Sequence, residues 1–151
     1  MNKDELKIQL GESPAYLGFD ESAEHLCVQI PPEELLNVMR QLRDREDLKL
    51  DYLYCMTCVD WKDHLMMVYM LRSVAHGIHL NVKVKLSDIA NPEIESLTGL
   101  WKTAELNENE IFDLFGVKFT HHPNLRRMFL EPDWKGYPLR KNYEDENMIK
   151  L

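Results

Sequence analysis

The chain has 151 residues, of which 44% are hydrophobic and 29% are charged, and this length fits one compact domain without room for a second. Its 6 glycines and 7 prolines are too few for a disordered, collagen-like or low-complexity protein. The net charge of −8 at pH 7 argues against nucleic acid as the partner and favours a protein.

The first predicted elements are a short strand and a helix. Residues 25–30 have the composition of a strand. We predict a helix over residues 32–46, because proline is tolerated and acidic side chains are favoured in a first helical turn, as in Pro32-Glu33-Glu34. Apolar residues then recur at helical spacing, opposite a charged face: they are Leu35, Leu36, Met39 and Leu42.

Three further strands are predicted over residues 52–59, 64–72 and 78–86. In the last of these, apolar and polar residues alternate, which is the pattern of a strand with one buried face. The turns between the strands are short enough for hairpins. We therefore expect an antiparallel meander with one helix before it.

A second helical region is predicted to begin near Asn91-Pro92, a favourable cap and first residue, and to end before Gly116, a natural C-terminal cap. Two interpretations stay open between these limits. A single helix would form one stripe from the positions Leu97, Trp101, Ala104, Glu108, Ile111 and Phe115. Alternatively, Asn107 followed by Glu110 resembles a capping box, so that a helix starts there and the stripe is interrupted.

Residues 118–151 follow no period, yet they include too many large apolar side chains for a free tail. We expect them to form an ordered extended arm that lies on protein. Residues 118–141 carry six Lys/Arg and two Asp/Glu, whereas residues 1–117 carry 11 and 21, so the arm is a basic segment on an acidic body. The predicted fold class is α+β: a single domain with a core over residues 1–117, made of a mainly antiparallel sheet packed with helices, followed by the basic C-terminal arm over residues 118–151.

The motifs predict no active site contained in this chain. Cys55 and Cys58 form a CxxC pair, but an offset of three in a strand points the two thiols to opposite faces, and no second pair exists to complete a metal site. Four histidines lack the nearby carboxylate or cysteine that would complete a ligand set: they are His76, His79, His121 and His122.

Membrane-spanning and secreted classes are also disfavoured. The longest apolar run, residues 65–71, is far shorter than the ~20 residues that cross a bilayer. The N-terminal sequence lacks the apolar centre of a secretory signal. Three cysteines, an odd number, fit a reducing compartment and predict no disulfide. We expect a cytoplasmic protein.

The strongest candidate site combines a carboxylate cluster with the basic arm. An ionised Glu108 on the apolar stripe would be costly to bury without a cation and hydrogen bonds. Bidentate pairing of arginine with carboxylate would fasten the arm to the helix; the alternative is solvated surface charges, each contributing about 0–1 kcal/mol. The candidate residues are Glu108, Glu110, Asp113, Gly116, His122, Arg126, Arg127, Arg140 and Lys141.

Residues 101–143 resemble the signature region of the C subunit, also called the 30 kDa subunit, of proton-translocating NADH:quinone oxidoreductase (respiratory complex I). The family pattern is roughly E-R-E-x-x-D, two hydrophobic residues and Gly, then His-Pro, L-R-R and P-L-R-K. The residues that match it are Glu108, Glu110, Asp113, Leu114, Phe115, Gly116, His122, Pro123, Leu125, Arg126, Arg127, Pro138, Leu139, Arg140 and Lys141. With a looser match at residues 57–61, the resemblance covers about residues 24–143. Asn109 stands where the family has Arg, and His121 stands where it usually has Gly.

The resemblance implies a scaffold subunit in the peripheral arm of the complex, on the cytoplasmic side of the bacterial membrane and attached to that membrane only through the complex. It implies no catalytic residue, metal or cofactor on this chain, since FMN, iron–sulfur clusters and quinone belong to partner subunits. The expected partners are subunits D and B, which form the quinone-reducing module. The hypothesis is that the carboxylate cluster and the arm hold the domain to the D subunit of that module.

Two other functions stay open. Homologous domains serve the same scaffold role in membrane-bound nickel–iron hydrogenase, formate hydrogenlyase and coenzyme F-420 dehydrogenase complexes. A free-standing thiol redox protein that uses Cys55 and Cys58 is an alternative of a different class.

Overall fold

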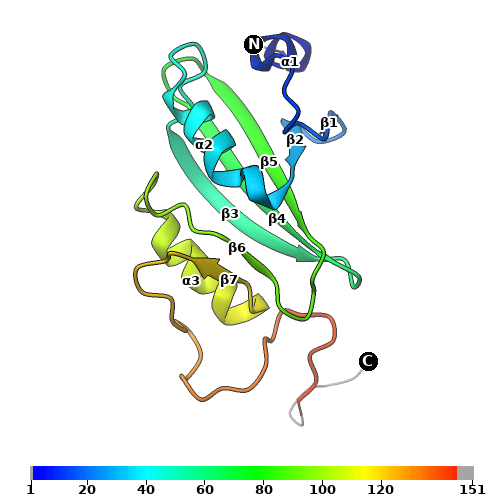
Figure 1. The fold of residues 1–151 in the computed structure, drawn as a ribbon, viewed down its shortest axis with the longest axis vertical. Helices are drawn as coiled ribbons and strands as arrows, with labels where there is room; N and C mark the ends of the chain where they lie inside the picture. The colour runs from blue at the N-terminus through cyan, green and yellow to red at the C-terminus, as the bar shows by residue number, and fades with distance from the viewer. Residues whose placement is uncertain (1, 146–151) are drawn as a thin grey trace.

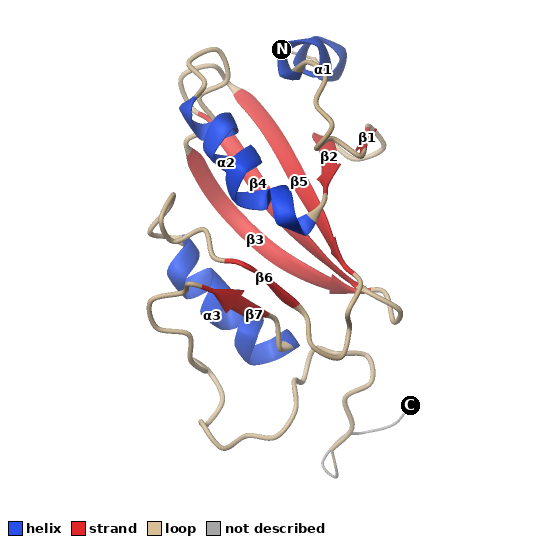
Figure 2. Cartoon of the chain, in the orientation of Figure 1, coloured by secondary structure: helices blue, strands red, loops and turns tan. Residues whose placement is uncertain are grey.

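The computed structural model describes residues 2–145 and has an α+β architecture (Figures 1 and 2). Its main sheet has five strands in the order β1-β2-β5-β4-β3, in which only β2 and β5 pair in parallel. The strands are β1 (Gly18–Asp20), β2 (Leu26–Ile30), β3 (Tyr52–Asp60), β4 (Leu65–Ser73) and β5 (Ile78–Leu86). The prediction of one α+β domain with a mainly antiparallel sheet is confirmed.

The meander β3-β4-β5 supplies most of the core. Apolar residues at alternate positions of these strands point to one face, and the buried side chains include Leu53, Met67, Leu71 and Val82. The other face of the same strands is more open, because its positions are half-buried or exposed apart from the buried Val68. Burying each large apolar side chain contributes about 1.5–3 kcal/mol, so the inner face holds the sheet against the helices.

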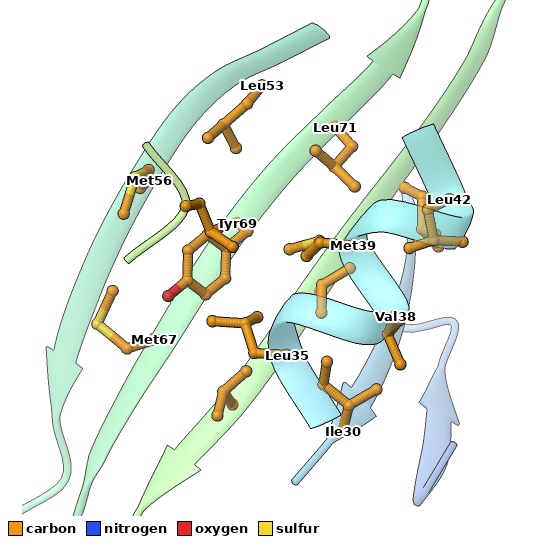
Figure 3. Close-up of a cluster of buried hydrophobic side chains, with 14 of the residues drawn as sticks. Ile30, Leu35, Val38, Met39, Leu42, Leu53, Met56, Met67, Tyr69 and Leu71 are labelled. Carbon is orange, nitrogen blue, oxygen red and sulfur yellow. The ribbon is translucent and has the colours of Figure 1, made fainter. Parts of the chain in front are cut away.

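Helix α2 (Leu35–Asp44) covers part of that inner face, as Figure 3 shows. It follows a single turn of 3-10 helix, η1 (Pro32–Glu34), which uses the two prolines at its start. Leu35, Met39 and Leu42 lie on one side of the helix and are essentially inaccessible to solvent. The helix predicted over residues 32–46 is therefore present, with its first turn tightened and its end two residues earlier.

The N-terminus forms two elements that the sequence patterns did not predict. Helix α1 (Lys3–Leu10) begins at Asn2, whose side chain accepts a hydrogen bond from the Glu5 backbone N–H while the Glu5 carboxylate accepts one from Asn2 N–H. Leu6 and Leu10 enter the main core. Arg45, just after α2, donates hydrogen bonds to the carbonyls of residues 9 and 10, which ties this helix to the domain. The second element is the short edge strand β1.

The second helical region departs from both interpretations. Residues 91–103 are not helical: they contain the short strand β6 (Glu93–Glu95) and turns, and helix α3 (Ala104–Phe115) begins after Thr103. Asn107 lies inside the helix and donates to the Thr103 carbonyl, so the predicted break at Asn107 is also wrong. The predicted end before Gly116 is confirmed, since Gly116 caps the helix in a left-handed conformation (φ 77°).

The reason for the departure is a contact between distant segments. Strand β6 pairs in parallel with β7 (Lys118–Thr120), which lies inside the segment expected to have no regular structure. The two-stranded sheet lies beside α3 in Figure 2. Pairing between segments so far apart in the sequence produces no local pattern that would reveal β6 as a strand. The apolar residues of 97–115, considered alone, have the spacing of a helix, and the pattern therefore indicates one.

Strand β3 is an edge strand, and side chains of the turn before α3 bind one carbonyl just before the strand and one near its start. The Trp101 indole N–H donates to the Asp51 carbonyl at 3.0 Å, and the Thr103 hydroxyl donates to the Leu53 carbonyl at 3.4 Å. The pairing of β3 with β4 is also irregular between Leu53 and Cys55. Among residues 2–145, no helix has the length and apolarity needed to cross a membrane.

Candidate partner-binding site: helix α3 and the C-terminal arm

The candidate residues gather where α3 meets the segment after β7. Asp113 is the centre of this region, and its side chain is fully buried. One carboxylate oxygen, Oδ2, accepts hydrogen bonds from the backbone N–H groups of Met128, Phe129 and Leu130 at 2.8–3.2 Å. Burial raises the pKa of Asp113, but these bonds and the one from Arg127 outweigh it, so the pKa lies below its ordinary value.

Arg127 joins this carboxylate to the rest of the arm. Its Nη1 donates to the Asp113 side chain at 3.0 Å and to the Asp113 carbonyl at 2.8 Å. Its Nη2 donates to the carbonyls of Trp134 and Gly136, and the guanidinium lies over the Tyr137 ring, 5.0 Å from the centroid. Arginine and carboxylate do pair here, within the chain, but the pairing is not the expected bidentate one, because only Nη1 meets the Asp113 carboxylate and Nη2 binds backbone carbonyls.

A second attachment lies near the end of the arm. Arg140 donates to the Phe115 carbonyl at 2.9 Å and to the Ile89 carbonyl. The Lys141 backbone N–H donates to Asp60 Oδ2 at 2.8 Å. Burial raises the pKa of Asp60, yet the backbone hydrogen bonds from Lys141 and Lys62 hold it below its ordinary value. The arm is therefore attached at α3 and again at the end of β3.

At Gly116 the end of the helix lies close against the arm. A Cβ at this position would lie 2.6 Å from the Tyr137 ring, and φ is +77°. Both the close approach and the left-handed backbone require glycine. The hydrogen bond from Leu139 N–H to the Leu114 carbonyl, at 3.0 Å, runs beside this contact.

Substituting Gly116 by alanine should therefore loosen the arm. We expect Gly116→Ala to lower the free energy of unfolding by about 1–3 kcal/mol, because alanine is strained at this φ and its methyl group meets the Tyr137 ring. Urea unfolding measures this change. Gly99→Ala is the matched control, since a Cβ at Gly99 meets nothing within 4 Å. Equal losses in the two variants would show that the contact with Tyr137 has no energetic role.

Glu108 differs from what its sequence position suggested. It is fully buried, as expected, but its oxygens accept hydrogen bonds from the Ser96 hydroxyl at 2.5 Å and from Leu97 N–H at 3.0 Å. Within residues 2–145 it forms no ion pair. The prediction that a cation of the arm pairs with Glu108 is therefore wrong. Burial raises the pKa of Glu108 to about 7, against the opposing effect of the Ser96 and Leu97 hydrogen bonds.

Known proteins are similar to this chain in sequence and in fold. A profile of the family described as "Respiratory-chain NADH dehydrogenase, 30 Kd subunit" matches residues 28–147. The chain is 38% identical to the C subunit of NADH-quinone oxidoreductase from Roseiflexus castenholzii, over 90% of this chain and 79% of that protein. It is 36% identical to the C subunit of the same enzyme from Citrifermentans bemidjiense, over 94% and 88%. The chain belongs to the 30 kDa subunit family.

Some relatives in this family are longer. The chain is 38% identical to the protein named as the C/D subunit of NADH-quinone oxidoreductase in Phocaeicola vulgatus, over 78% of this chain but only 22% of that protein. The chain thus spans about a fifth of the length of that relative, whereas it covers most of the C-subunit proteins. A solved structure of the membrane-bound sulfane sulfur reductase, an archaeal respiratory membrane complex, contains a chain of the same fold, with a TM-score of 0.75 and 23% identity over 93% of this chain and 85% of that one.

The two departures from the pattern of the 30 kDa family have structural explanations. Asn109 is buried, and its side-chain oxygen accepts a hydrogen bond from Arg126 N–H at 3.1 Å, so this residue also holds the arm. His121 adopts φ 64°, the left-handed region in which glycine is favoured. Its Nδ1 lies 2.7 Å from Glu95 Oε1, and this bond compensates part of the backbone strain.

The remaining signature residues divide into internal and outward-facing groups. His122 accepts the Asn124 N–H on Nδ1, so Nε2 carries the proton that it donates to the Glu105 carbonyl at 3.0 Å. Pro138 is half-buried. The side chains that face solvent are those of Glu110, Pro123, Arg126 and Lys141.

Sequence reasoning missed the apolar side chains on the outside of the arm. Phe129, Trp134 and Leu139 are 65%, 38% and 53% exposed. The sequence did indicate that this segment is rich in large apolar residues and has no regular period. Which side the Phe129 side chain faces depends on the hydrogen bonds that fix residues 128–130 to Asp113. Large apolar side chains exposed along one ordered segment are candidates for an interaction site.

The cysteine pair agrees with its expected placement. Cys58 pairs with the inward-facing Met67 and is buried, whereas Cys55 pairs with Met70 and is half-buried. Burial raises the pKa of Cys58 to about 12, which leaves it an unreactive thiol at neutral pH. No group of three or more potential metal-binding side chains occurs in residues 2–145.

Proposed function

We propose that the chain is the scaffold C subunit of a proton-translocating NADH:quinone oxidoreductase and docks to the quinone-module subunits D and B. In this role it holds no cofactor and no catalytic residue; FMN, the iron–sulfur clusters and quinone are bound by its partners. It lies on the cytoplasmic side of the membrane, which it contacts only through the complex. Its contribution to electron transfer from NADH to quinone is to keep the quinone module rigid.

The relatives support this proposal over the hydrogenase-type alternative. Family membership points to an NADH dehydrogenase subunit, and relatives covering most of the chain are named as the C subunit of NADH-quinone oxidoreductase. Others join C and D in one name, which favours the D subunit as a direct neighbour. The sulfane sulfur reductase, at 23% identity, supports the fold only.

The observation that carries the proposal is the outward face of the arm. Asp113, Arg127 and Arg140 are engaged within the chain, so they position the arm and are not available as its main contacts with a partner. Positioned in this way, the arm presents Phe129 and Leu139 to solvent. Aromatic side chains such as Phe129 are enriched in the buried core of protein interfaces, and a few buried anchors supply most of the binding free energy.

The proposal predicts that charges on this face prevent assembly. We expect the double variant Phe129→Asp, Leu139→Asp to reduce the recovery of subunits D and B about tenfold or more, because buried, unpaired carboxylates would oppose docking. The measurement is a mild-detergent pull-down of the tagged chain from its native membranes, with mass spectrometry of the subunits and an assay of NADH-dependent quinone reduction.

The matched control changes exposed apolar side chains elsewhere. Ile8 and Val74 are 81% and 71% exposed, on α1 and in the β4–β5 turn. Ile8→Asp with Val74→Asp should leave assembly intact. If both double variants assemble normally, the arm is not the docking surface; if hydrogenase subunits are recovered with the wild-type chain, the alternative complex is the correct one.

A further inference from the structure

A second open surface lies on the opposite side of the sheet from α2. It consists of the outward-facing side chains of β3, β4 and β5, and we call it the outer sheet face. Strand pairing places Val59, Met66 and Lys85 side by side across the three strands, and Thr57, the buried Val68 and Lys83 in the next row. Val59 is 38% exposed and Lys85 is exposed. Residues 2–145 therefore leave the row of Val59, Met66 and Lys85 open to solvent.

The outward side chains of β3, β4 and β5 carry positive charge, whereas the chain as a whole is acidic. The outward positions of β3, β4 and β5 include Arg72, Lys83 and Lys85 but no aspartate or glutamate. Two acidic side chains of neighbouring segments face these lysines: Asp20 on β1 lies 4.0 Å from Lys83 Nζ, and Asp63 in the β3–β4 turn interacts electrostatically with Lys85. The chain as a whole has a net charge of −8. An apolar strip flanked by lysines on an acidic protein is complementary to an apolar surface that carries carboxylates.

We propose that the outer sheet face binds an acidic, amphipathic segment of another protein subunit of the same complex. Apolar side chains of that segment would cover the strip formed by Val59 and Met66, and its carboxylates would meet Lys85 and Arg72. This interface is separate from the arm, and it rests on the proposed function only in that the chain is part of a multisubunit complex.

Two other occupants fit the observations less well. A second copy of the chain would bring the same basic positions face to face, where like charges repel. An anionic membrane would attract Arg72, Lys83 and Lys85 but repel the acidic body around them. An acidic protein segment satisfies both the apolar strip and the lysines.

The test is lysine acylation followed by mass spectrometry, on the free chain and on the complex purified from native membranes. We expect labelling of Lys83 and Lys85 to fall severalfold on assembly. The arm lysines Lys135 and Lys141 report in the same experiment on the docking of the arm. Protection of the arm alone would overturn the second interface and leave the proposed function standing; protection of the sheet alone would do the reverse.

A cross-linking experiment then identifies the occupant. A photoreactive amino acid in place of Thr57 should capture a peptide of another subunit that is net acidic and amphipathic. Capture of the same chain, of a basic peptide, or of lipid would overturn the proposal, as would sedimentation of the free chain with anionic phospholipid vesicles at physiological salt.

Charge reversal tests the electrostatic part. Arg72→Glu with Lys85→Glu should weaken retention of the captured subunit about tenfold, which corresponds to about 1.4 kcal/mol. The control is Arg40→Glu with Lys102→Glu, exposed residues on α2 and in the turn before α3; this variant carries the same charge change and should retain the subunit. Circular dichroism confirms that both variants are folded, and equal retention by both would contradict the proposal.

Discussion

Replacing Asp113 by alanine is expected to lower the free energy of unfolding by about 3–5 kcal/mol, because it leaves the Arg127 guanidinium without its carboxylate and three backbone N–H groups without an acceptor. The arm should detach from α3 before the domain unfolds. Urea unfolding measures the stability, and the rate of trypsin cleavage after Arg126 and Arg127 measures the release of the arm.

The control for this variant is on the same helix. Glu110 is exposed, so Glu110→Ala should change the stability by no more than about 0.5 kcal/mol and leave the cleavage rate as in the wild type. A trypsin-resistant Asp113→Ala protein would mean that other contacts, such as those of Arg140, suffice to hold the arm.

Replacing Glu108 by glutamine is expected to raise stability at neutral and basic pH. The pKa of Glu108 is raised from 4.5 to about 7, so the folded chain binds more protons than the unfolded chain between these values. Its effect on stability is absent below pH 4.5, grows as the pH rises, and reaches a penalty of about 3 kcal/mol above pH 7. Glutamine is neutral throughout: its amide oxygen can accept the Leu97 N–H, and its amide N–H can donate to the Ser96 hydroxyl oxygen in place of the bond that this hydroxyl donates to Glu108.

The measurement is urea unfolding of both proteins at several pH values from 5 to 8. The free energies of unfolding of the two proteins should be similar at the acid end and diverge as the pH rises, with Glu108→Gln more stable than the wild type. Glu110→Gln, which removes an exposed carboxyl from the same helix, shows the effect of the charge alone. A constant difference between Glu108→Gln and wild type over this range would show that Glu108 ionises as an ordinary glutamate.

The elements that could be predicted are those with a strong local pattern. Strand β5 has the predicted bounds, because alternation over nine residues has one interpretation. The helix after Pro32 was also predictable, since its first turn and apolar face agree. Helix α1 was missed although Asn2 and Glu5 form a capping box, because only two of its apolar side chains, Leu6 and Leu10, enter the core.

The part that could not be predicted depends on contacts between distant residues. Strand β6 exists because it pairs with β7, and neither three-residue segment has a strand pattern of its own. The sequence, through its charged residues and its resemblance to a family, predicted which residues belong to the candidate site. It did not predict which carboxylate pairs with which cation. Sequence position placed Glu108 and Asp113 in one cluster, whereas Asp113 alone meets an arginine and Glu108 accepts hydrogen bonds from Ser96 and Leu97.

The side-chain hydrogen bonds at the start of β3 bear on the behaviour of the free subunit. An unprotected edge strand recruits strands of other molecules and so promotes aggregation. Here Trp101 and Thr103 occupy carbonyls of residues 51 and 53, and the irregular pairing at Cys55 bends the edge away from the flat geometry that an incoming strand needs. The start of this edge is therefore protected against strand addition in the interval between synthesis of the chain and its incorporation beside other subunits.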